Sequence, residues 1–484
     1  MSLTFLIAVP LLAALFIALL QSKHTRLIEQ AVLFSGTVEL AMALWLIPMV
    51  VDQGSVSASS LFSLDPLGAF LSLIIALVGF FASLYSVGYL RAEMNKAIIG
   101  PRRVRQYFLL LKLFFFAMFL AVAAKSPVVM WIAIEATTLS TAFLISFYHK
   151  PSATEAAWKY LILNSVGLLL SLLGTLLFLL LPDMKEGVVT WQILHESAAT
   201  LQPWIVKIAF VFILVGYGTK VGLVPLHTWK PDAYSKAPTP IAALLSSILL
   251  NVAFFAILRF KGVADATLQS SFTNELLLFF GVLSIVFSSL IIFIQKNYKR
   301  LLAYSSIEQA GLLALGFGFG GVGVFAALLH MFYHALAKTL IFFAAGNIFL
   351  KYSSTKMHQV TGVLRTLPLT GPVFFLAFIA LLGLPPFGLF TTEFLLLSTG
   401  MAHYPILVAI VLVALAIMFF GFLKHLVAML FGTVPDGISF GESNVLTQLP
   451  LVLLLALFAT LSWYVPELLH TLINLSAQGI ALNF

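Results

Sequence analysis

The sequence predicts an all-α polytopic membrane protein with about fourteen transmembrane helices. Hydrophobic residues make up 61% of the 484 residues, charged residues only 9%, and the mean hydropathy is +1.08. Average soluble chains carry about a quarter charged residues, so this composition excludes a soluble globular protein. Apolar stretches of about 20 residues, each long enough to cross a bilayer as a helix, recur along the whole chain. The polar stretches between them are too short for a soluble domain, and the phosphate-binding pattern GxxxxGKS/T is absent.

The expected spans follow one another with short connections. Their approximate extents are 3–21, 28–51, 66–90, 107–124, 127–148, 155–181, 203–226, 239–260, 272–295, 301–319, 322–349, 368–397, 403–432 and 447–470. After the first span, the basic residues Lys23 and Arg26 follow the apolar run instead of preceding it. A cleavable signal peptide has the opposite order, so we expect this span to be retained.

Basic residues cluster in the loops that follow odd-numbered spans. These residues are Lys23, Arg26, Arg91, Lys96, Arg102, Arg103, Arg105, Lys150, Lys230, Lys236, Lys296, Lys299, Arg300, Lys351, Lys356 and Arg365. The loops after even-numbered spans are poor in Lys and Arg, and they contain Asp52, Asp65, Asp183, Lys185, Glu186 and Glu196. By the positive-inside rule the odd loops are cytoplasmic, so both termini are expected outside. The formal charge of +8 then reflects membrane topology and not nucleic acid binding.

Five ionisable residues lie inside apolar stretches, where a charge costs about 2.5–3.5 kcal/mol on insertion scales. They are Glu135, Lys220, Glu308, Lys338 and Glu393. Packing alone favours leucine at such positions, so each one is a candidate functional residue. A static buried ion pair between Glu135 and Lys220 is the structural alternative. For Lys112, about one turn into its span, we expect the long stem to reach the cytoplasmic surface. Lys159 is equally consistent with a surface anchor and with a site residue.

The segment HMFYHALAK places His330, His334 and Lys338 at positions i, i+4 and i+8. At 3.6 residues per turn they form one polar stripe about 12 Å long. Histidine titrates near neutral pH, so this stripe favours a hydrated path for protons. Helix–helix hydrogen bonding is the structural alternative. Zinc binding is a third interpretation, but the sequence shows no cysteine and no well-placed carboxylate nearby.

Two of the expected spans contain helix breaks. Gly222 and Pro225 interrupt span seven, and Pro385 and Pro386 interrupt span twelve. Proline removes a backbone donor, and in lipid the freed backbone groups must be satisfied by protein or water. Breaks in corresponding positions of two halves indicate an inverted repeat with sites near the midplane. Packing kinks without a function are the alternative.

Lys220 before the first break is the candidate centre of a switchable proton site. If Glu135 lies beside Lys220, the lysine holds its proton; if the two separate, burial drives its release. The broken helix would supply the polar groups and water that carry this proton.

Three segments resemble the antiporter-like membrane subunits of complex I, of Mrp-type sodium/proton antiporters and of group 4 membrane-bound hydrogenases. They read TKVGLVPLHTWKPDAYSKAPTPIAALLSSILLN, NYKRLLAYSSIEQAGLLALG and HALAKTLIFFAAGN. The resemblance implies fourteen transmembrane helices and two inverted five-helix repeats with broken helices seven and twelve. It divides the chain into helices 1–3 (residues 1–106), a first repeat of helices 4–8 (107–260), a second repeat of helices 9–13 (261–432) and a C-terminal helix 14 (433–484).

The resemblance also assigns roles to single residues. Glu135 matches the key glutamate of helix five and Lys220 the central lysine of helix seven. His330, His334 and Lys338 match the polar stripe of helix eleven, and Glu393 matches an ionisable position of helix twelve. Many relatives have lysine in helix eight, where this chain has Asn251, which cannot relay a proton by titrating. Asn251 together with Glu308 is most similar to the F-type subunit of hydrogenase-4 and formate hydrogenlyase.

The function that the resemblance implies is proton translocation within a redox-driven respiratory or hydrogenase-type complex. The chain has no cysteine, so it can hold no cysteine-ligated cluster. Cofactors are expected only in partner subunits, as a nickel–iron centre and iron–sulfur clusters. The partners would be other membrane subunits and a hydrophilic arm on the cytoplasmic side of a bacterial or archaeal cytoplasmic membrane. The alternatives are an Mrp-type sodium/proton antiporter subunit and an energy-coupling subunit of an inorganic-carbon accumulation complex.

Overall fold

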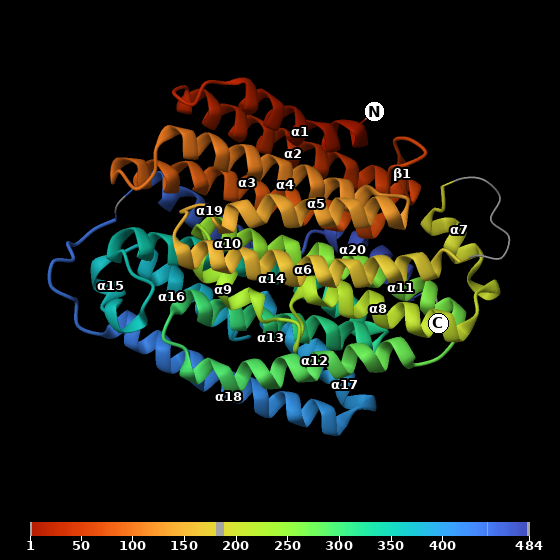
Figure 1. Cartoon of the computed structure of the whole chain (residues 1–484). Coiled ribbons are helices and arrows are strands. Elements are labelled where there is room, and N and C mark those ends of the chain that lie inside the picture. The colour runs from red at the N-terminus through yellow and green to blue at the C-terminus, as the bar shows by residue number, and fades with distance from the viewer. Residues whose placement is uncertain (1, 181–187, 443, 482–484) are drawn as a thin grey trace.

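The computed structural model describes residues 2–180, 188–442 and 444–481. The loop charges Asp183, Lys185 and Glu186 and the expected end of span six lie outside the described residues. The described chain is almost entirely helical, with helices lying side by side along one common direction (Figure 1). One short antiparallel hairpin joins β1 (Val56–Ser57) to β2 (Ser63–Leu64).

The helices follow the order of the expected spans. The N-terminal half contains α1 (Ser2–Leu19), α2 (Thr25–Gln53), α3 (Pro66–Asn95), α4 (Pro101–Ala123), α5 (Pro127–Ile145), α6 (Pro151–Phe178), α7 (Trp191–Glu196), α8 (Pro203–Val221), α9 (Trp229–Lys236), α10 (Thr239–Leu244) and α11 (Leu250–Leu268). The C-terminal half contains α12 (Phe272–Ile291), α13 (Tyr298–Phe319), α14 (Val322–Tyr352), α15 (Val363–Thr366), α16 (Thr370–Leu381), α17 (Gly388–His403), α18 (Pro405–Phe431), α19 (Val445–Trp463) and α20 (Glu467–Ala481).

Proline begins many of these helices. It occupies the first turn of α3, α4, α5, α6, α8 and α18. At this position the missing N–H has no helical partner to lose, and the fixed φ suits a helix. Asp65 adds a side-chain cap to α3 by accepting from the Gly68 N–H at 2.9 Å. Local sequence thus explains where these helices start.

Twelve helices of the described chain are long and apolar enough to cross a membrane. This confirms the predicted fold class. The count of about fourteen stays a prediction, since α13 and the pair α16–α17 occupy the places of two further expected spans but are not among the twelve. The expected span 447–470 is corrected: α19 ends at Trp463, and a separate 15-residue helix, α20, follows.

Both expected helix breaks are present. The first separates α8 from α9 and the second separates α16 from α17. Gly222 and Gly383, at φ +82° and +62°, adopt the left-handed conformation that glycine accepts without steric cost. The peptide bonds before Pro225 and Pro386 are cis. Span seven therefore does not end at 226; its second half, α9, runs to Lys236.

Helix α14 lies at the centre of the bundle. It packs against α3, α10, α13, α16, α17, α19 and α20. Of its most apolar stretch, 94% is buried inside the protein, against 33% for the peripheral α18. The edges of the bundle are formed by α1 and α2 on one side and by α12 and α18 on the other (Figure 1). Polar residues on α14 consequently face other helices and not lipid.

Lys112 corrects a second expectation. Its side chain does not reach the surface: it is 0% exposed, and its Nζ donates to Glu39 Oε1 of α2 at 2.9 Å. The ring of Phe115 lies 5.3 Å from the same nitrogen. Snorkelling needs an open route to water, and α1, α2 and α3 all pack against α4.

Candidate functional site

Glu135 and Lys220 are joined through a hydroxyl group and make no direct ion pair. Lys220 Nζ donates to Thr138 Oγ1, and Thr138 Oγ1 lies 3.4 Å from Glu135 Oε2, to which its hydroxyl can donate. Thr138 is one turn after Glu135 on α5, so both side chains share one face of the helix. Ser165 of α6 also donates to Glu135, at 3.1 Å. The three groups form a hydrogen-bond chain in which the Lys220 ammonium donates to the Thr138 hydroxyl and the hydroxyl donates to the Glu135 carboxylate.

Lys220 and Glu135, at the two ends of this hydrogen-bond chain, have different surroundings. Lys220 is 1% exposed, and besides Thr138 it contacts only the Ile134 carbonyl at 3.4 Å and the Tyr160 ring at 5.8 Å among the described residues. Glu135, by contrast, is partly exposed.

Lys230 was expected in a cytoplasmic loop, but the structure buries it completely. It begins α9 directly after the break, and its Nζ donates to the Val221 carbonyl at 2.5 Å. The neighbouring Trp229 donates from Nε1 to the Thr219 carbonyl at 2.8 Å. The last carbonyls of a helix have no partner within the helix, so these two residues cap the end of α8. Sequence reasoning missed Lys230 because a broken helix was treated as ending at its break.

The stripe on α14 is buried as predicted. His330, His334 and Lys338 are each 0% exposed, and the two imidazole rings are stacked with centroids 6.4 Å apart. Lys338 Nζ donates to Ser305 Oγ at 2.7 Å and to the Leu302 carbonyl at 3.1 Å, both on α13. Neither ring nitrogen of His334 has a hydrogen-bond partner among the described residues. Buried polar atoms are nearly always satisfied, so this site is suited to water.

Gln309 of α13 joins several polar side chains at the His330 end of the stripe. Its amide nitrogen donates to Glu308 at 3.1 Å and to Glu393 of α17 at 3.3 Å. Its Oε1 lies 2.6 Å from His330 Nε2, which must donate because an amide oxygen only accepts. His330 Nδ1 contacts Thr392 Oγ1 at 2.9 Å. One glutamine thus connects the imidazole to two buried carboxylates, and sequence reasoning missed it because an amide within a span carries no charge signal.

Asn251 lies beside the stripe, following one turn of π-helix over Leu245–Leu249. Its Nδ2 contacts the Met331 carbonyl of α14 at 3.4 Å, while its Oδ1 has no partner among the described residues. Single π-turns inside α-helices occur frequently at functional sites. The amide is therefore placed to hold water next to His330 and His334, but it cannot exchange a proton by titration.

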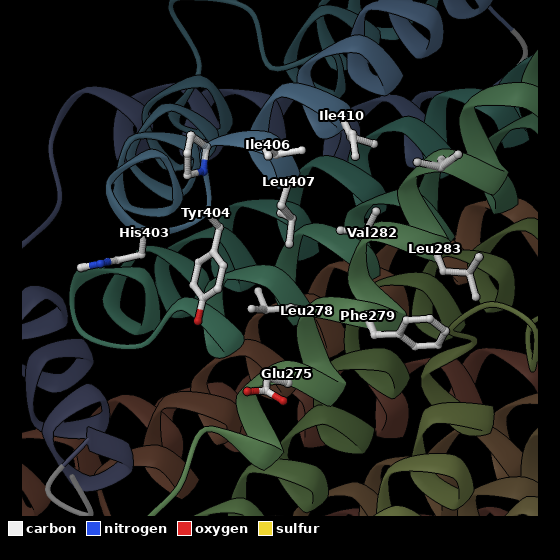
Figure 2. Close-up of a pocket in the computed structure, with 12 residues that line it drawn as sticks. Glu275, Leu278, Phe279, Val282, Leu283, His403, Tyr404, Ile406, Leu407 and Ile410 are labelled. Atoms are coloured by element: carbon white, nitrogen blue, oxygen red, sulfur yellow. The ribbon is translucent and has the colours of Figure 1, made fainter.

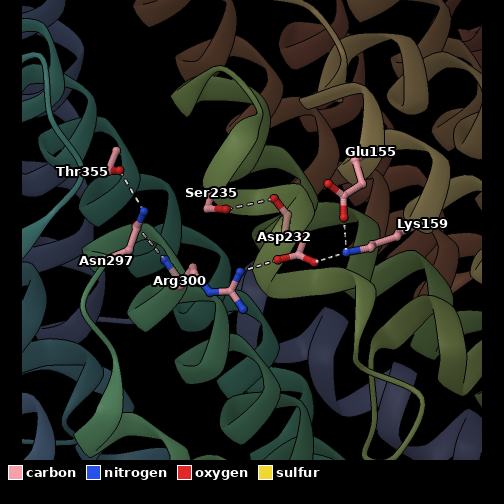
Figure 3. Close-up of polar contacts among 7 residues, drawn as sticks. All are labelled: Glu155, Lys159, Asp232, Ser235, Asn297, Arg300 and Thr355. Atoms are coloured by element: carbon pink, nitrogen blue, oxygen red, sulfur yellow. Dashed lines mark hydrogen bonds and ion pairs between the residues drawn. The ribbon is translucent and has the colours of Figure 1, made fainter. Parts of the chain in front are cut away.

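Lys159 lies apart from the buried residues. Its side chain is 49% exposed and pairs with Glu155 at 2.6 Å and with Asp232 at 3.4 Å. Asp232 of α9 also pairs with Arg300 of α13 (Figure 3). This network ties the second half of the first broken helix to α6 and α13. The structure brings Lys159 into a surface network and not among the buried residues.

Two cavities differ in chemistry. The cavity of about 730 Å³ between α12 and the turn from α17 to α18 has mostly apolar walls, with Glu275, His403 and Tyr404 toward one end (Figure 2). None of the predicted site residues lines it. A cavity of about 330 Å³ is lined by charged residues from odd loops and the helix ends beside them, namely Glu93, Lys96, Lys150, Lys236 and Lys299. Of these two cavities, the second has the charged lining; a third cavity, of about 290 Å³, is also polar and is lined by Asp65, Lys125 and Arg259 among others.

The groups described above form two hydrogen-bonded clusters. Thr138 joins Glu135 to Lys220 in the first, and Gln309 joins His330, Glu308 and Glu393 in the second. Lys230 binds the end of α8, and Lys338 binds α13. Among the described residues, no cluster of three His, Cys, Asp or Glu side chains is suited to a metal ion. Buried acids and bases beside two broken helices are typical of ion-translocating membrane proteins.

The chain belongs to the family described as NADH:quinone oxidoreductase/Mrp antiporter, TM, whose model matches residues 124–419. Residues 51–97 match the model described as NADH-ubiquinone oxidoreductase (complex I), chain 5 N-terminus. The chain is 40% identical to the hydrogenase-4 component F homolog of Methylacidiphilum infernorum over 77% of this chain and 79% of that one. It is 30% identical to NADH-quinone oxidoreductase subunit N of Desulforudis audaxviator, over 72% and 69% of the two chains.

Solved structures have the same fold. A chain of the membrane-bound sulfane sulfur reductase, an archaeal respiratory membrane complex, superposes with a TM-score of 0.88 at 26% identity, covering 99% of this chain and 97% of that one. A chain of respiratory complex I from Thermus thermophilus superposes with a TM-score of 0.77 at 25% identity, covering 96% and 97%. The Mrp complex from Dietzia sp. contains a chain at 0.87 and 21% identity, covering 99% and 97%, a likeness of fold alone. These neighbours are chains of multi-subunit membrane complexes, so this chain is an antiporter-like membrane subunit.

Proposed function

We propose that this subunit translocates protons, driven by redox chemistry in partner subunits of a hydrogenase-type or NADH:quinone oxidoreductase-type complex. The observation that carries the proposal is the series of titratable groups inside the bundle from Glu135 to Glu393, all of them buried except the partly exposed Glu135. We call this series the proposed proton line. A charge inside a membrane protein is costly and persists where a function requires it. A scaffold would need none of these groups.

The hydrogen-bond chain from Lys220 through Thr138 to Glu135 is the proposed place where proton release is controlled. In the observed arrangement Thr138 separates the carboxylate from Lys220. A shift of α5 relative to α8 that brings Glu135 against Lys220 favours the protonated lysine, and the reverse shift favours release toward Lys230 and α14. Such a shift would come from an adjacent membrane subunit, which could contact the partly exposed Glu135.

The polar cavity at Glu93 is the proposed uptake route. Glu93 accepts from the Tyr148 hydroxyl at 2.6 Å, and its second oxygen has no partner among the described residues. Lys299 lines the same cavity at the start of α13. Leu302 and Ser305, the two partners of Lys338, lie about one and about two turns further along α13. This cavity is on the side proposed to be cytoplasmic, with both termini on the other side of a bacterial or archaeal cytoplasmic membrane.

The test uses the whole complex in inverted membrane vesicles. Proton uptake is measured with a pH-sensitive dye while the electron donor is oxidised, in native protein and in Glu135→Gln. We expect the variant to assemble and to lose proton uptake. Undiminished uptake in the assembled variant refutes the proposal. Proton movement that needs sodium and no electron donor supports an Mrp-type antiporter instead, and copurification of nickel and iron–sulfur clusters supports a hydrogenase-type partner with its hydrophilic arm.

A further inference from the structure

Lys230 is a buried lysine that has no acidic partner among the described residues. It is 0% exposed, and no carboxylate lies within 4 Å of its Nζ among the described residues. Its Nζ donates to the Val221 carbonyl at 2.5 Å and lies 6.0 Å from the centroid of the Tyr234 ring. Buried charges are ordinarily paired, so this residue requires an explanation beyond packing.

The end of α8 explains why a hydrogen-bond donor is needed at this position, but it does not explain why the donor is a lysine. The C-terminus of a helix carries a partial negative charge and unpaired carbonyls, which attract a cation. Trp229 satisfies the Thr219 carbonyl at the same helix end with a neutral N–H. A neutral donor would equally serve the Val221 carbonyl, without the cost of burying an ammonium group.

The groups that face Lys230 from the neighbouring elements are basic. Lys338 of α14 is near enough to Lys230 for their charges to interact, and His334 of α14 interacts with both lysines. His227, in the loop between α8 and α9, also interacts electrostatically with Lys230. Basic groups buried close together cannot all be protonated at the same time. A proton that binds to one of them lowers the affinity of the next group for its own proton. This coupling is what a relay requires.

The second broken helix shows the same construction. A Cβ built at Gly222 would lie 2.6 Å from Lys230 Cδ, and one built at Gly383 would lie 2.7 Å from Glu393 Cδ. In each half, an ionisable side chain from the helix after the break folds back onto a left-handed glycine before it. Lys230 is therefore the counterpart of Glu393, which the proposed proton line already contains.

We propose that Lys230 carries protons between the Lys220 end of the line and the α14 stripe, supplying the titratable group that Asn251 does not. This inference rests on the proposed function and adds a residue to it. In each transfer the ammonium of Lys230 gives one proton to the next free base, and the resulting amine regains one proton from the Lys220 side. No bond other than N–H is made or broken.

The experiment compares three substitutions at Lys230 in the complete complex. Lys230→Arg keeps the donor and the charge but cannot release a proton. Lys230→Gln keeps a donor without the charge, and Lys230→His keeps a donor that titrates near neutral pH. The matched control is Lys207→Gln, an exposed lysine on α8 that lines none of the cavities described above. Assembly is followed by copurification, and proton uptake by inverted vesicles is measured from about pH 6 to 9, the range in which histidine titrates.

We expect the Arg and Gln variants to assemble and to lose proton uptake by about tenfold or more. The His variant should retain uptake with a changed pH dependence, and the control should match native protein. Native uptake in an assembled Arg or Gln variant means that Lys230 is only a cap and overturns the inference. If neither assembles, an assembled His variant without uptake at any pH overturns it. Loss of uptake in Lys220→Gln with normal uptake in the Lys230 variants rejects this inference alone, whereas normal uptake in both rejects the proposed function.

Discussion

Thr138 is the only described residue that connects Lys220 to Glu135 by hydrogen bonds. Removing its hydroxyl therefore tests whether protons pass along this hydrogen-bond chain. Thr138→Val keeps the shape of the side chain and removes the hydroxyl group. Lys220 is then left with a 3.4 Å contact to the Ile134 carbonyl and the Tyr160 ring. A hydrogen bond to a charged group is worth about 1.5–3 kcal/mol, which corresponds to about a 10- to 150-fold change in an equilibrium.

We therefore expect proton uptake by Thr138→Val vesicles to fall by about one to two orders of magnitude at unchanged assembly. Thr138→Ser retains the hydroxyl and serves as the matched control, with uptake close to native. The assay is donor-driven uptake in inverted vesicles, normalised to the amount of assembled complex. Equal uptake by the Val and Ser variants would show that protons do not pass through this hydroxyl, and the reasoning from the observed contacts would fail.

Three further predictions concern stability, the surface network and topology. Lys112→Met leaves Glu39 unpaired and should cost about 3–5 kcal/mol, whereas Glu39→Leu combined with Lys112→Met should recover most of it; thermal unfolding in detergent checks this, and equal stability of the two variants would contradict it. Asp232→Asn should cost about 1 kcal/mol or less because its pairs are partly exposed, and a loss that does not shrink in high salt would argue against this origin. Because the chain contains no cysteine, Gln53→Cys and Lys23→Cys can each be labelled alone; an impermeant maleimide should reach them from opposite sides, and labelling from one side would disprove the topology.

Much of the fold followed from local signals in the sequence. Hydropathy predicted the order and approximate extents of the helices, because every helix that crosses a bilayer needs an apolar stretch of its own. Proline and glycine predicted both breaks, because their backbone preferences act without help from distant residues. The same local reasoning misplaced the ends of spans seven and fourteen, since a helix that resumes after a break looks like a loop in the sequence.

The identities of the buried ionisable residues could also be predicted, but not their partners. The burial cost of a charge depends on the residue and its apolar neighbours in sequence, so Glu135, Lys220 and Lys338 were recognisable without coordinates. Their contacts come from other helices: Lys220 meets Thr138 across 82 residues of chain, and Lys338 meets Ser305 across 33. A neutral side chain such as Gln309 gains importance only from such contacts.

What the sequence by itself determined is the class of protein, the rough course of the helices, the two breaks and most of the interior charges. The tertiary structure alone decided which charges meet: Lys112 with Glu39, Lys159 with a surface network, and Lys230 with the end of α8. The physical reason is that hydropathy and backbone preference are properties of a segment. Pairing and burial depend instead on which side chains the packed helices bring together from distant parts of the chain.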